Sequence, residues 1–188
     1  MTNESNSMRR LLRGLAALAA AGLAAVLLVG CAGPKLEDHV GEKPVFDFRQ
    51  YFNGTVHARG LVTDRGGKLL RRFVVTLRCD WAGDVGTLDE RFVYSDGEQQ
   101  QRIWHVRRLP GGGWSGTADD VLGEAAGAAV GSAFNWRYTL KLPVRGTVYE
   151  VQFDDWMYLI DERTVINKAV MSKFGVHIGD VTLSFTRP

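Results

Sequence analysis

Cysteine is nearly absent from this chain of 188 residues, which contains only Cys31 and Cys79. Two cysteines allow at most one disulfide, and none remains within the chain if Cys31 is chemically modified. Histidine is also scarce: the four residues are scattered, with no His-x-His or His-x₃-His pair. This spacing provides no zinc-type ligand set. The sequence therefore predicts no structural disulfide, no metal site and no cofactor.

Recognisable catalytic motifs and an excess of charge are missing as well. No Gly-x-Ser-x-Gly elbow occurs, and Gly111-Gly112-Gly113 does not lead into a helix that could hold a phosphate. The 23 basic and 21 acidic side chains become 20 and 20 once the three arginines and one glutamate of residues 1–30 are removed. A neutral mature chain gives no electrostatic reason to expect nucleic acid as a partner.

The first 30 residues have the pattern of an export signal. Arginines precede an apolar run from Leu15 to Val29, as in the n-region and h-region of a secretory signal. A transmembrane anchor is the weaker alternative, because a span needs about 20 apolar residues. The run ends in Leu28-Val29-Gly30-Cys31, which resembles the lipobox of bacterial lipoproteins. That resemblance implies cleavage before Cys31 and acylation of its thiol and of the new amine.

The resemblance also implies a location. Acyl chains stabilise membrane attachment by ~0.8 kcal/mol per buried methylene, so two or more chains anchor a protein firmly. In Gram-negative lipoproteins an aspartate after the cysteine acts as an inner-membrane retention signal, whereas this chain has Ala32. We therefore expect attachment to the periplasmic leaflet of the outer membrane. Export by the ordinary Sec route fits better than the twin-arginine route, and either Met1 or Met8 starts the chain.

The mature chain has the pattern of one all-β domain. Residues 31–44, rich in proline, glycine and charge, are expected to form an acylated tether, and residues 45–188 a single domain. Most later segments alternate with period two between turn residues, which favours an antiparallel meander, closed as a barrel or folded as a sandwich. We favour a closed up-and-down β-barrel, preceded by a short helix, because closure removes exposed edges. The expected strands are 55–63, 69–81, 88–94, 101–109, 134–142, 147–154, 164–170 and 181–186.

One segment does not follow the alternation. Gly123, Gly127 and Gly131 are spaced by four, which would place them on one face of a helix. Glycine costs ~1 kcal/mol relative to alanine at each helical position, however. In a strand the same spacing marks bends or a close approach of the backbone. We favour strand–bend–strand over helix for residues 123–132.

The chain resembles two known families, of which the first supports this fold and the second supports the assignment as a lipoprotein. Phe46-Asp47, Tyr51 and Gly54 resemble the opening of lipocalin barrels, in which a short helix plugs one end, although Val56 replaces the tryptophan that lipocalins have two residues after the glycine. A second resemblance, to an uncharacterised family of bacterial lipoproteins with a domain of unknown function, spans nearly the whole mature chain and implies no activity. It is carried by GTADD (116–120), WRY (136–138), LPV (142–144), FDDWM (153–157) and MSKFG (171–175).

Two aspartate doublets are the main candidates for chemistry. Asp119-Asp120 and Asp154-Asp155 could each present one carboxylate inward, because neighbours on a strand point to opposite faces. Two inward carboxylates about 5 to 9.5 Å apart could act as an acid–base pair. The alternative, which we favour, is a structural or ligand-orienting role, with one aspartate of each doublet paired to a buried cation such as Arg137 or Lys173.

Aromatic residues suggest a binding site instead. Trp136, Tyr138, Phe153 and Trp156 are candidates to line a cavity, next to small side chains from residues 123–133. Arg137 or Lys173 would then meet a carboxylate head group. Ordinary core packing explains each aromatic residue taken singly.

Three functions therefore stay open. The first is a membrane-anchored periplasmic lipoprotein that binds or carries an apolar, lipid-like ligand in its barrel. The second is an envelope enzyme acting on lipid or glycan through the aspartates, and the third is a purely structural envelope module. The sequence favours the first and does not identify any protein partner. Cys79 is expected to be a buried, inert thiol, because it alternates in phase with Phe73, Val75 and Leu77.

Overall fold

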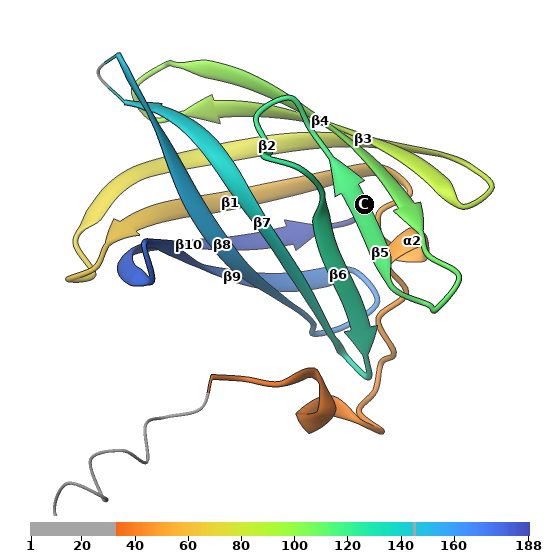
Figure 1. Ribbon diagram of the computed structural model, residues 1–188. Coiled ribbons are helices and arrows are strands. Elements are labelled where there is room, and N and C mark those ends of the chain that lie inside the picture. Colours follow the sequence, from red (N-terminus) through yellow and green to blue (C-terminus); the bar gives the residue numbers. More distant parts are fainter. Residues whose placement is uncertain (1–32, 145) are drawn as a thin grey trace, which may run out of the picture. The chain divides into compact units, whose positions relative to one another are not determined.

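The computed structural model describes residues 33–144 and 146–188. Within these residues, each strand pairs in antiparallel fashion with its neighbours along the chain, and β1 also pairs with β10, so the sheet closes into a barrel (Figure 1). The predicted all-β, up-and-down barrel is thus confirmed. The strands are β1 (Gly54–Asp64), β2 (Leu69–Ala82), β3 (Val85–Tyr94), β4 (Gln99–Arg108), β5 (Trp114–Thr117), β6 (Ala125–Val130), β7 (Ala133–Val144), β8 (Thr147–Leu159), β9 (Thr164–Lys173) and β10 (Val176–Thr186).

Alternation of side chains decides what the barrel encloses. In β2, Phe73, Val75 and Leu77 are buried, whereas the intervening Val74 and Arg78 are exposed. Because successive side chains on a strand point to opposite faces, the even spacing of apolar residues places them all inside. Alternation of the same kind in β1 and β9, and over parts of the other long strands, gives one core along the barrel axis.

Short turns join the strands at one end of the barrel, which we call the turn end. The β1–β2 turn is held by Asp64, whose Oδ1 accepts hydrogen bonds from the backbone N–H groups of Gly66 and Lys68. Gly67 has a φ of 81°, a left-handed conformation that glycine adopts without steric cost. The turns β3–β4, β7–β8 and β9–β10 lie at this same end.

The opposite end, which we call the cap end, is closed by a short helix. Helix α2 (Phe48–Tyr51) begins after Asp47, whose carboxylate accepts a hydrogen bond from the backbone N–H of Gln50. Phe48, Tyr51 and Phe52 are buried, and the Trp81 indole donates to the carbonyl of Phe52 at 2.6 Å. The aromatic side chains therefore plug the barrel, as the lipocalin resemblance implied.

The segment before α2 lies against the same barrel. A 3₁₀ helix, η1 (Leu36–His39), places His39 beside the rings of Trp156 and Tyr158, and Glu42 accepts a hydrogen bond from Ser132. Residues Leu36–Pro188 form one compact unit that contains all the described strands, the cap and the core. The predicted boundaries at residues 30 and 44 stay predictions, and Cys31 lies outside the described residues.

The glycine-rich segment forms a strand and no helix. Gly123 and Gly131 have positive φ angles on either side of β6, and Gly127 lies within it opposite Trp136. Strand β5 was not predicted, because its four residues are too few to show alternation. Among the described residues, no helix is both long and apolar enough to cross a membrane.

Candidate functional site

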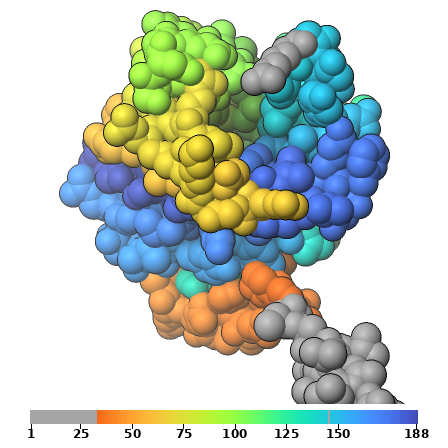
Figure 2. All heavy atoms as spheres, turned by 90° about the vertical axis from the view of Figure 1, so that its left-hand side faces the viewer, coloured from red at the N-terminus to blue at the C-terminus, as the bar shows by residue number. Residues whose placement is uncertain are grey.

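A cavity of about 390 Å³ runs inside the barrel between the cap and the turn end. Most of its walls are apolar, with side chains from the cap (Phe48, Phe52) and from strands on all sides of the axis, such as Leu88 and Met171. Figure 2 looks onto the turn end, where the surface is hollowed between the green residues of β3–β4 and the cyan residues of β7–β8. The barrel is therefore hollow rather than filled.

Three of the predicted ligand-binding aromatics line this cavity. Trp136, Tyr138 and Phe153 are all lining residues. Tyr138 and Phe153 face each other across the β7–β8 ladder and stack, with ring centroids 5.0 Å apart and an angle of 7°. Trp156, the fourth, is buried but lies outside the cavity lining, stacked on Tyr158 beside η1.

The two predicted cations do not line the cavity. Arg137 is on the outer surface, 64% exposed, and pairs with Asp154 at 3.2 Å. Lys173 lies over the ring of Tyr149, with its Nζ 3.9 Å from the ring centroid. Neither side chain belongs to the cavity lining, so neither meets a head group inside the barrel.

The aspartate doublets behave differently from each other. In β8, strand alternation turns Asp155 inward, where it is 6% exposed, and leaves Asp154 outside. The other doublet lies in the loop between β5 and β6, and there Asp119 is exposed while Asp120 is partly buried. Strand alternation therefore turns one aspartate inward only in the second doublet, where Asp155 lines the cavity; in the first, Asp120 is partly buried in a loop and lies outside the cavity lining.

The buried cation that pairs with Asp120 is Arg102 in β4. Its Nε lies 3.0 and 2.9 Å from the two carboxylate oxygens, and its Nη2 lies 2.7 Å from Oδ2. Glu90 of β3 lies on the other side, 3.7 Å from Nη1. Both Glu90 and Arg102 line the cavity, so the guanidinium is held between two carboxylates.

Sequence reasoning missed this pair, although a signal was present. Glu90 alternates in phase with the inward-facing Leu88 and Phe92, and Arg102 alternates in phase with the buried Trp104. A charged residue on the apolar face of a strand is the informative observation.

A second polar group surrounds Asp155. Tyr138 donates a hydrogen bond from its hydroxyl to Oδ2 at 3.3 Å, and Asn167 of β9 donates from Nδ2 to Oδ1 and to the carbonyl of Trp156. Asn167 is 1% exposed and lines the cavity, yet its Oδ1 has no hydrogen-bond partner. A buried acceptor without a donor is costly, because its desolvation is not offset.

Burial dominates the acid–base properties of these groups. It raises the pKa of Asp155 to about 7, against hydrogen bonds from Asn167 and Tyr138 that lower it. Burial also raises the pKa of Glu90 to about 7, against the positive charge of Arg102. For Arg102 itself, burial acts to lower the pKa, but the hydrogen bonds to Asp120 and the charge of Glu90 outweigh it. The cavity therefore holds two carboxyl groups that exchange protons near neutral pH.

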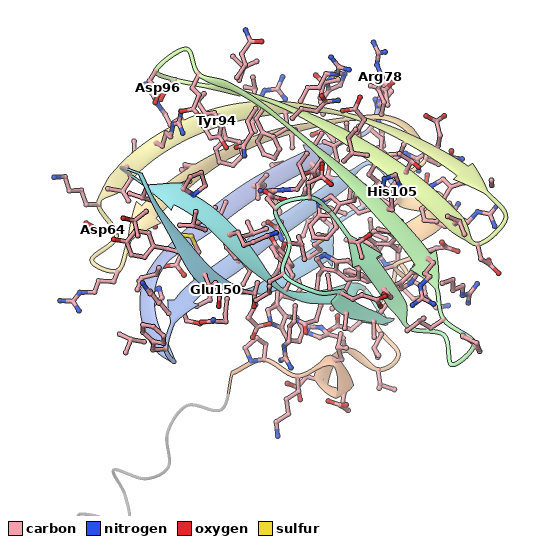
Figure 3. The ribbon with its side chains drawn as sticks, turned by 45° about the horizontal axis from the view of Figure 1, so that its top comes forward. Asp64, Arg78, Tyr94, Asp96, His105 and Glu150 are labelled. Carbon is pink, nitrogen blue, oxygen red and sulfur yellow. The ribbon has the colours of Figure 1, made fainter. Side chains whose placement is uncertain are left out.

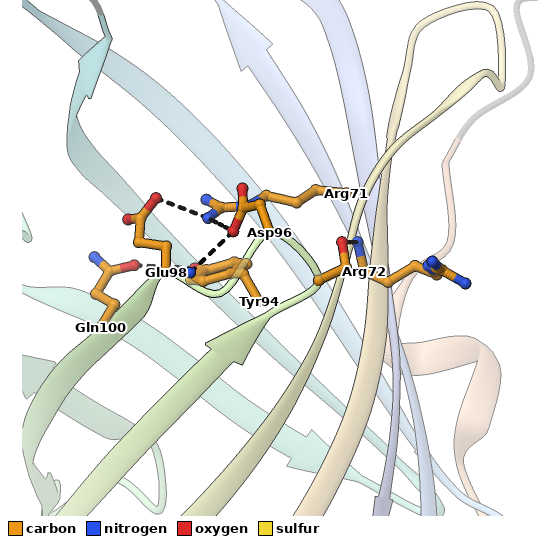
Figure 4. Close-up of polar contacts among 7 residues, drawn as sticks. Arg71, Arg72, Tyr94, Asp96, Glu98 and Gln100 are labelled. Carbon is orange, nitrogen blue, oxygen red and sulfur yellow. Dashed lines mark hydrogen bonds and ion pairs between the residues drawn. The ribbon is translucent and has the colours of Figure 1, made fainter.

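A third polar group marks the turn end of the cavity (Figure 4). The guanidinium of Arg71 lies 3.6 Å from the centroid of the Tyr94 ring and pairs with Asp96 and Glu98, each at 2.7 Å. The Tyr94 hydroxyl donates to Gln100 at 2.9 Å. Tyr94 and Asp96 lie near the same rim in Figure 3, so these contacts fix the side chains around the cavity mouth.

The small side chains of residues 123–133 leave no extra space. A Cβ added to Gly127 would overlap the ring of Trp136, and one added to Gly116 would come within 2.8 Å of it. The indole therefore fills the volume that the glycines vacate, and no residue of β6 lines the cavity. The expectation that this segment creates the hollow was wrong for a packing reason: a large neighbour fills it.

Other candidate chemistries find no support in the described part of the chain. Cys79 is buried, and burial raises the pKa of its thiol to about 12, as expected for an inert cysteine. No cluster of three or more His, Cys, Asp or Glu side chains suited to a metal occurs within residues 33–144 and 146–188.

Fold and cavity together define a class: a closed, lipocalin-like β-barrel with an internal cavity. Residues 25–187 match the family model described as a protein of unknown function (DUF3833), and the chain belongs to that family. No curated protein matches the sequence.

Solved structures resemble the chain in fold alone. A protein of unknown function from the DUF3598 family of Nostoc punctiforme superposes with a TM-score of 0.53 at 13% identity, covering 84% of this chain and 53% of that one. The present chain thus spans about half the length of that protein. Apocrustacyanin C2 gives a TM-score of 0.42 at 12% identity, covering 84% of this chain and 71% of that one.

Proposed function

We propose that the barrel binds a single-chain, lipid-like ligand in its internal cavity. The observation that carries the proposal is a mostly apolar cavity of about 390 Å³ with a few polar groups on its wall. Ligand pockets of proteins have roughly 300–1,000 Å³ and the same mixture of apolar walls and a few polar groups. A packed structural module would instead fill its interior with side chains.

The proposal includes a location at a membrane. The export signal, the lipobox and Ala32 support an acylated protein on the periplasmic leaflet of the outer membrane, anchored through Cys31. On this proposal the protein binds or carries lipid-like molecules next to the membrane that anchors it, with no nucleic acid as partner.

Binding is tested by displacement of a fluorescent apolar probe from residues 32–188, which contain the whole compact unit. Single-chain amphiphiles should displace the probe in a saturable way. Ala169 is 2% exposed and lines the cavity, so Ala169→Phe should fill it and weaken binding at least tenfold. The matched control is Ala126→Phe on the exposed face of β6, which should bind like the unaltered protein. Equal probe binding by both variants would refute an internal site.

One observation favours a second candidate, an envelope enzyme acting on lipid or glycan. Glu90 and Asp155 both have a pKa raised to about 7 by burial, and general acid–base residues work best with a pKa near the operating pH. Incubation of the protein with extracted envelope lipids and glycans, followed by mass spectrometry, tests this candidate. Product formation that Asp155→Asn abolishes would favour the enzyme over the carrier.

A further inference from the structure

The polar wall around Asp155 and Asn167, away from Arg71 at the turn end, presents acceptors rather than donors. The donors of Arg102 are engaged by Asp120 in three contacts of 3.0 Å or less, with Glu90 on the remaining side. The Tyr138 hydroxyl is committed to Asp155, and both donating contacts of Asn167 are made within the protein. Among the described lining residues, two buried side-chain atoms lack a hydrogen-bond partner: the Asn167 Oδ1 acceptor beside Asp155, and the Arg71 Nε donor at the turn end. The carboxyl groups of Asp155 and Glu90, although engaged by protein groups, keep further acceptor lone pairs.

The unpartnered Oδ1 of Asn167 is the independent sign of a missing ligand group. Its side chain is almost completely buried and its orientation is fixed, because Nδ2 donates to two oxygens. Rotation of the amide would remove the hydrogen bond that Nδ2 donates to the Trp156 carbonyl, so it would exchange one unmade contact for another. A donor supplied by a ligand would remove this cost.

Charge selects among possible donors. The cavity wall near Asn167 carries Glu90 from β3, Arg102 from β4 and Asp155 from β8, with Asp120 behind Arg102. Asp120 alone balances the guanidinium, so ionisation of Glu90 or Asp155 leaves excess negative charge. The other lining guanidinium, Arg71, lies at the turn end, where Asp96 and Glu98 balance its charge. A carboxylate head beside Asn167 would therefore face negative charge, whereas an ammonium head would neutralise it.

We propose that the head group of the ligand is a cationic amine, bound by Asp155, Glu90 and the free Oδ1 of Asn167. This inference rests on the proposed function, because it assigns the chemistry of the same cavity. A bound cation favours the ionised form of the neighbouring carboxyl groups, both of which have a pKa raised to about 7. Binding therefore releases protons, and affinity for the amine increases as the pH rises from 6 to 8.

The experiment compares three probes of equal chain length on residues 32–188: dodecylamine, dodecanol and dodecanoate, each below its micelle concentration. At pH 8 the amine should bind at least tenfold more tightly than the alcohol, and the acid most weakly. The amine should bind roughly tenfold more tightly at pH 8 than at pH 6, whereas the alcohol should show no such change. If the alcohol or the acid binds as tightly as the amine, the head-group assignment is wrong while the carrier function stands. If none of the three binds, the proposed function itself fails.

Variants test whether the amine binds to Asp155 and Glu90 or is attracted by acidic groups elsewhere on the protein. Asp155→Asn should reduce the preference for amine over alcohol at least tenfold and reduce the pH dependence, while alcohol binding is retained. The matched control is Asp154→Asn, its neighbour on the outer surface, which should leave both unchanged. Glu90→Gln provides a second test in case the first variant fails to fold. Unchanged amine preference in a folded Glu90→Gln or Asp155→Asn protein would overturn the proposal.

Discussion

Asp155→Asn should stabilise the barrel near neutral pH and leave its stability almost unchanged in acid. The carboxyl group has an ordinary pKa of 3.8 in the unfolded chain and a pKa of about 7 in the fold, because burial disfavours its charge. Between these values the unfolded state releases a proton that the folded state keeps, so the free energy of unfolding falls as the pH rises. Below the unfolded pKa both states are protonated, and above the folded pKa both are ionised. The free energy of unfolding therefore changes with pH only between these two values, and the stability lost there stays lost at higher pH.

The expected magnitude follows from the size of the shift. A change of about three pKa units at ~1.36 kcal/mol per unit sets a ceiling of about 4 kcal/mol lost to Asp155 by pH 8. Glu90, whose pKa rises from 4.5 to about 7 by the same mechanism, adds about 3 kcal/mol. Carboxylates near the surface with a lowered pKa, such as the partly exposed Asp89 and the exposed Asp96, act with the opposite sign and lose their contribution as the pH falls below about 4. The range from pH 5 to 7 therefore isolates the two cavity carboxyls.

Chemical denaturation of residues 32–188 at pH 5, 6, 7 and 8 measures this effect. The unaltered protein should lose about 3 kcal/mol per pH unit between pH 5 and 7, and Asp155→Asn about half of that. Asparagine keeps an Oδ1 acceptor for Asn167 and can donate to the Tyr138 oxygen, so the hydrogen bonds need not be lost. Asp154→Asn should retain the full slope. Equal slopes in all three proteins, or a variant less stable than the unaltered protein at pH 8, would refute a buried carboxyl with a raised pKa.

Three further predictions concern residues outside this titration. Arg102→Met should lower the free energy of unfolding in urea by about 3–5 kcal/mol, because Asp120 and Glu90 lose their buried partner. The control Arg137→Met removes the exposed pair with Asp154 and should cost less than about 1 kcal/mol. Equal costs would contradict the burial argument. Cys79 should resist iodoacetamide at pH 8 in the native protein and react on unfolding, since burial raises its thiol pKa to about 12; rapid native alkylation would contradict this. Cys31→Ser in the full chain should abolish labelling by radioactive palmitate, and it should also prevent cleavage of the signal peptide. Normal processing of that variant would rule out lipidation.

Much of the fold could be predicted because alternation recurs, in whole or in part, in the long strands. The period of two in β2 specifies which face is buried, and turn residues between strands specify antiparallel neighbours. Closure could be argued only from the cost of exposed edges, and the pairing of β1 with β10 confirms it. The four residues of β5 and the packing of Trp136 against Gly127 depend on tertiary contacts that no local pattern encodes.

The site was predicted less completely than the fold. Alternation correctly separates Asp154 from Asp155, because both lie within one regular strand. It says nothing about partners across the barrel, and so Arg137 was a reasonable but incorrect choice for the buried cation. Arg102 lies on β4, and its contact with Asp120 depends on how the loop before β6 folds back.

The features that make the cavity a candidate site are those that cost the barrel stability. An unfilled volume forgoes dispersion contacts, and Asp155 and Glu90 each hold a proton that the unfolded chain would release at neutral pH. Leucine at these two positions would continue the apolar face of β8 and β3 and remove both costs. A sequence that places acids there, beside an Asn167 acceptor with no donor, violates local rules of stability at one place in an otherwise consistent barrel. Such violations concentrate where a protein binds or reacts, because the ligand supplies the contacts that the fold leaves unmade.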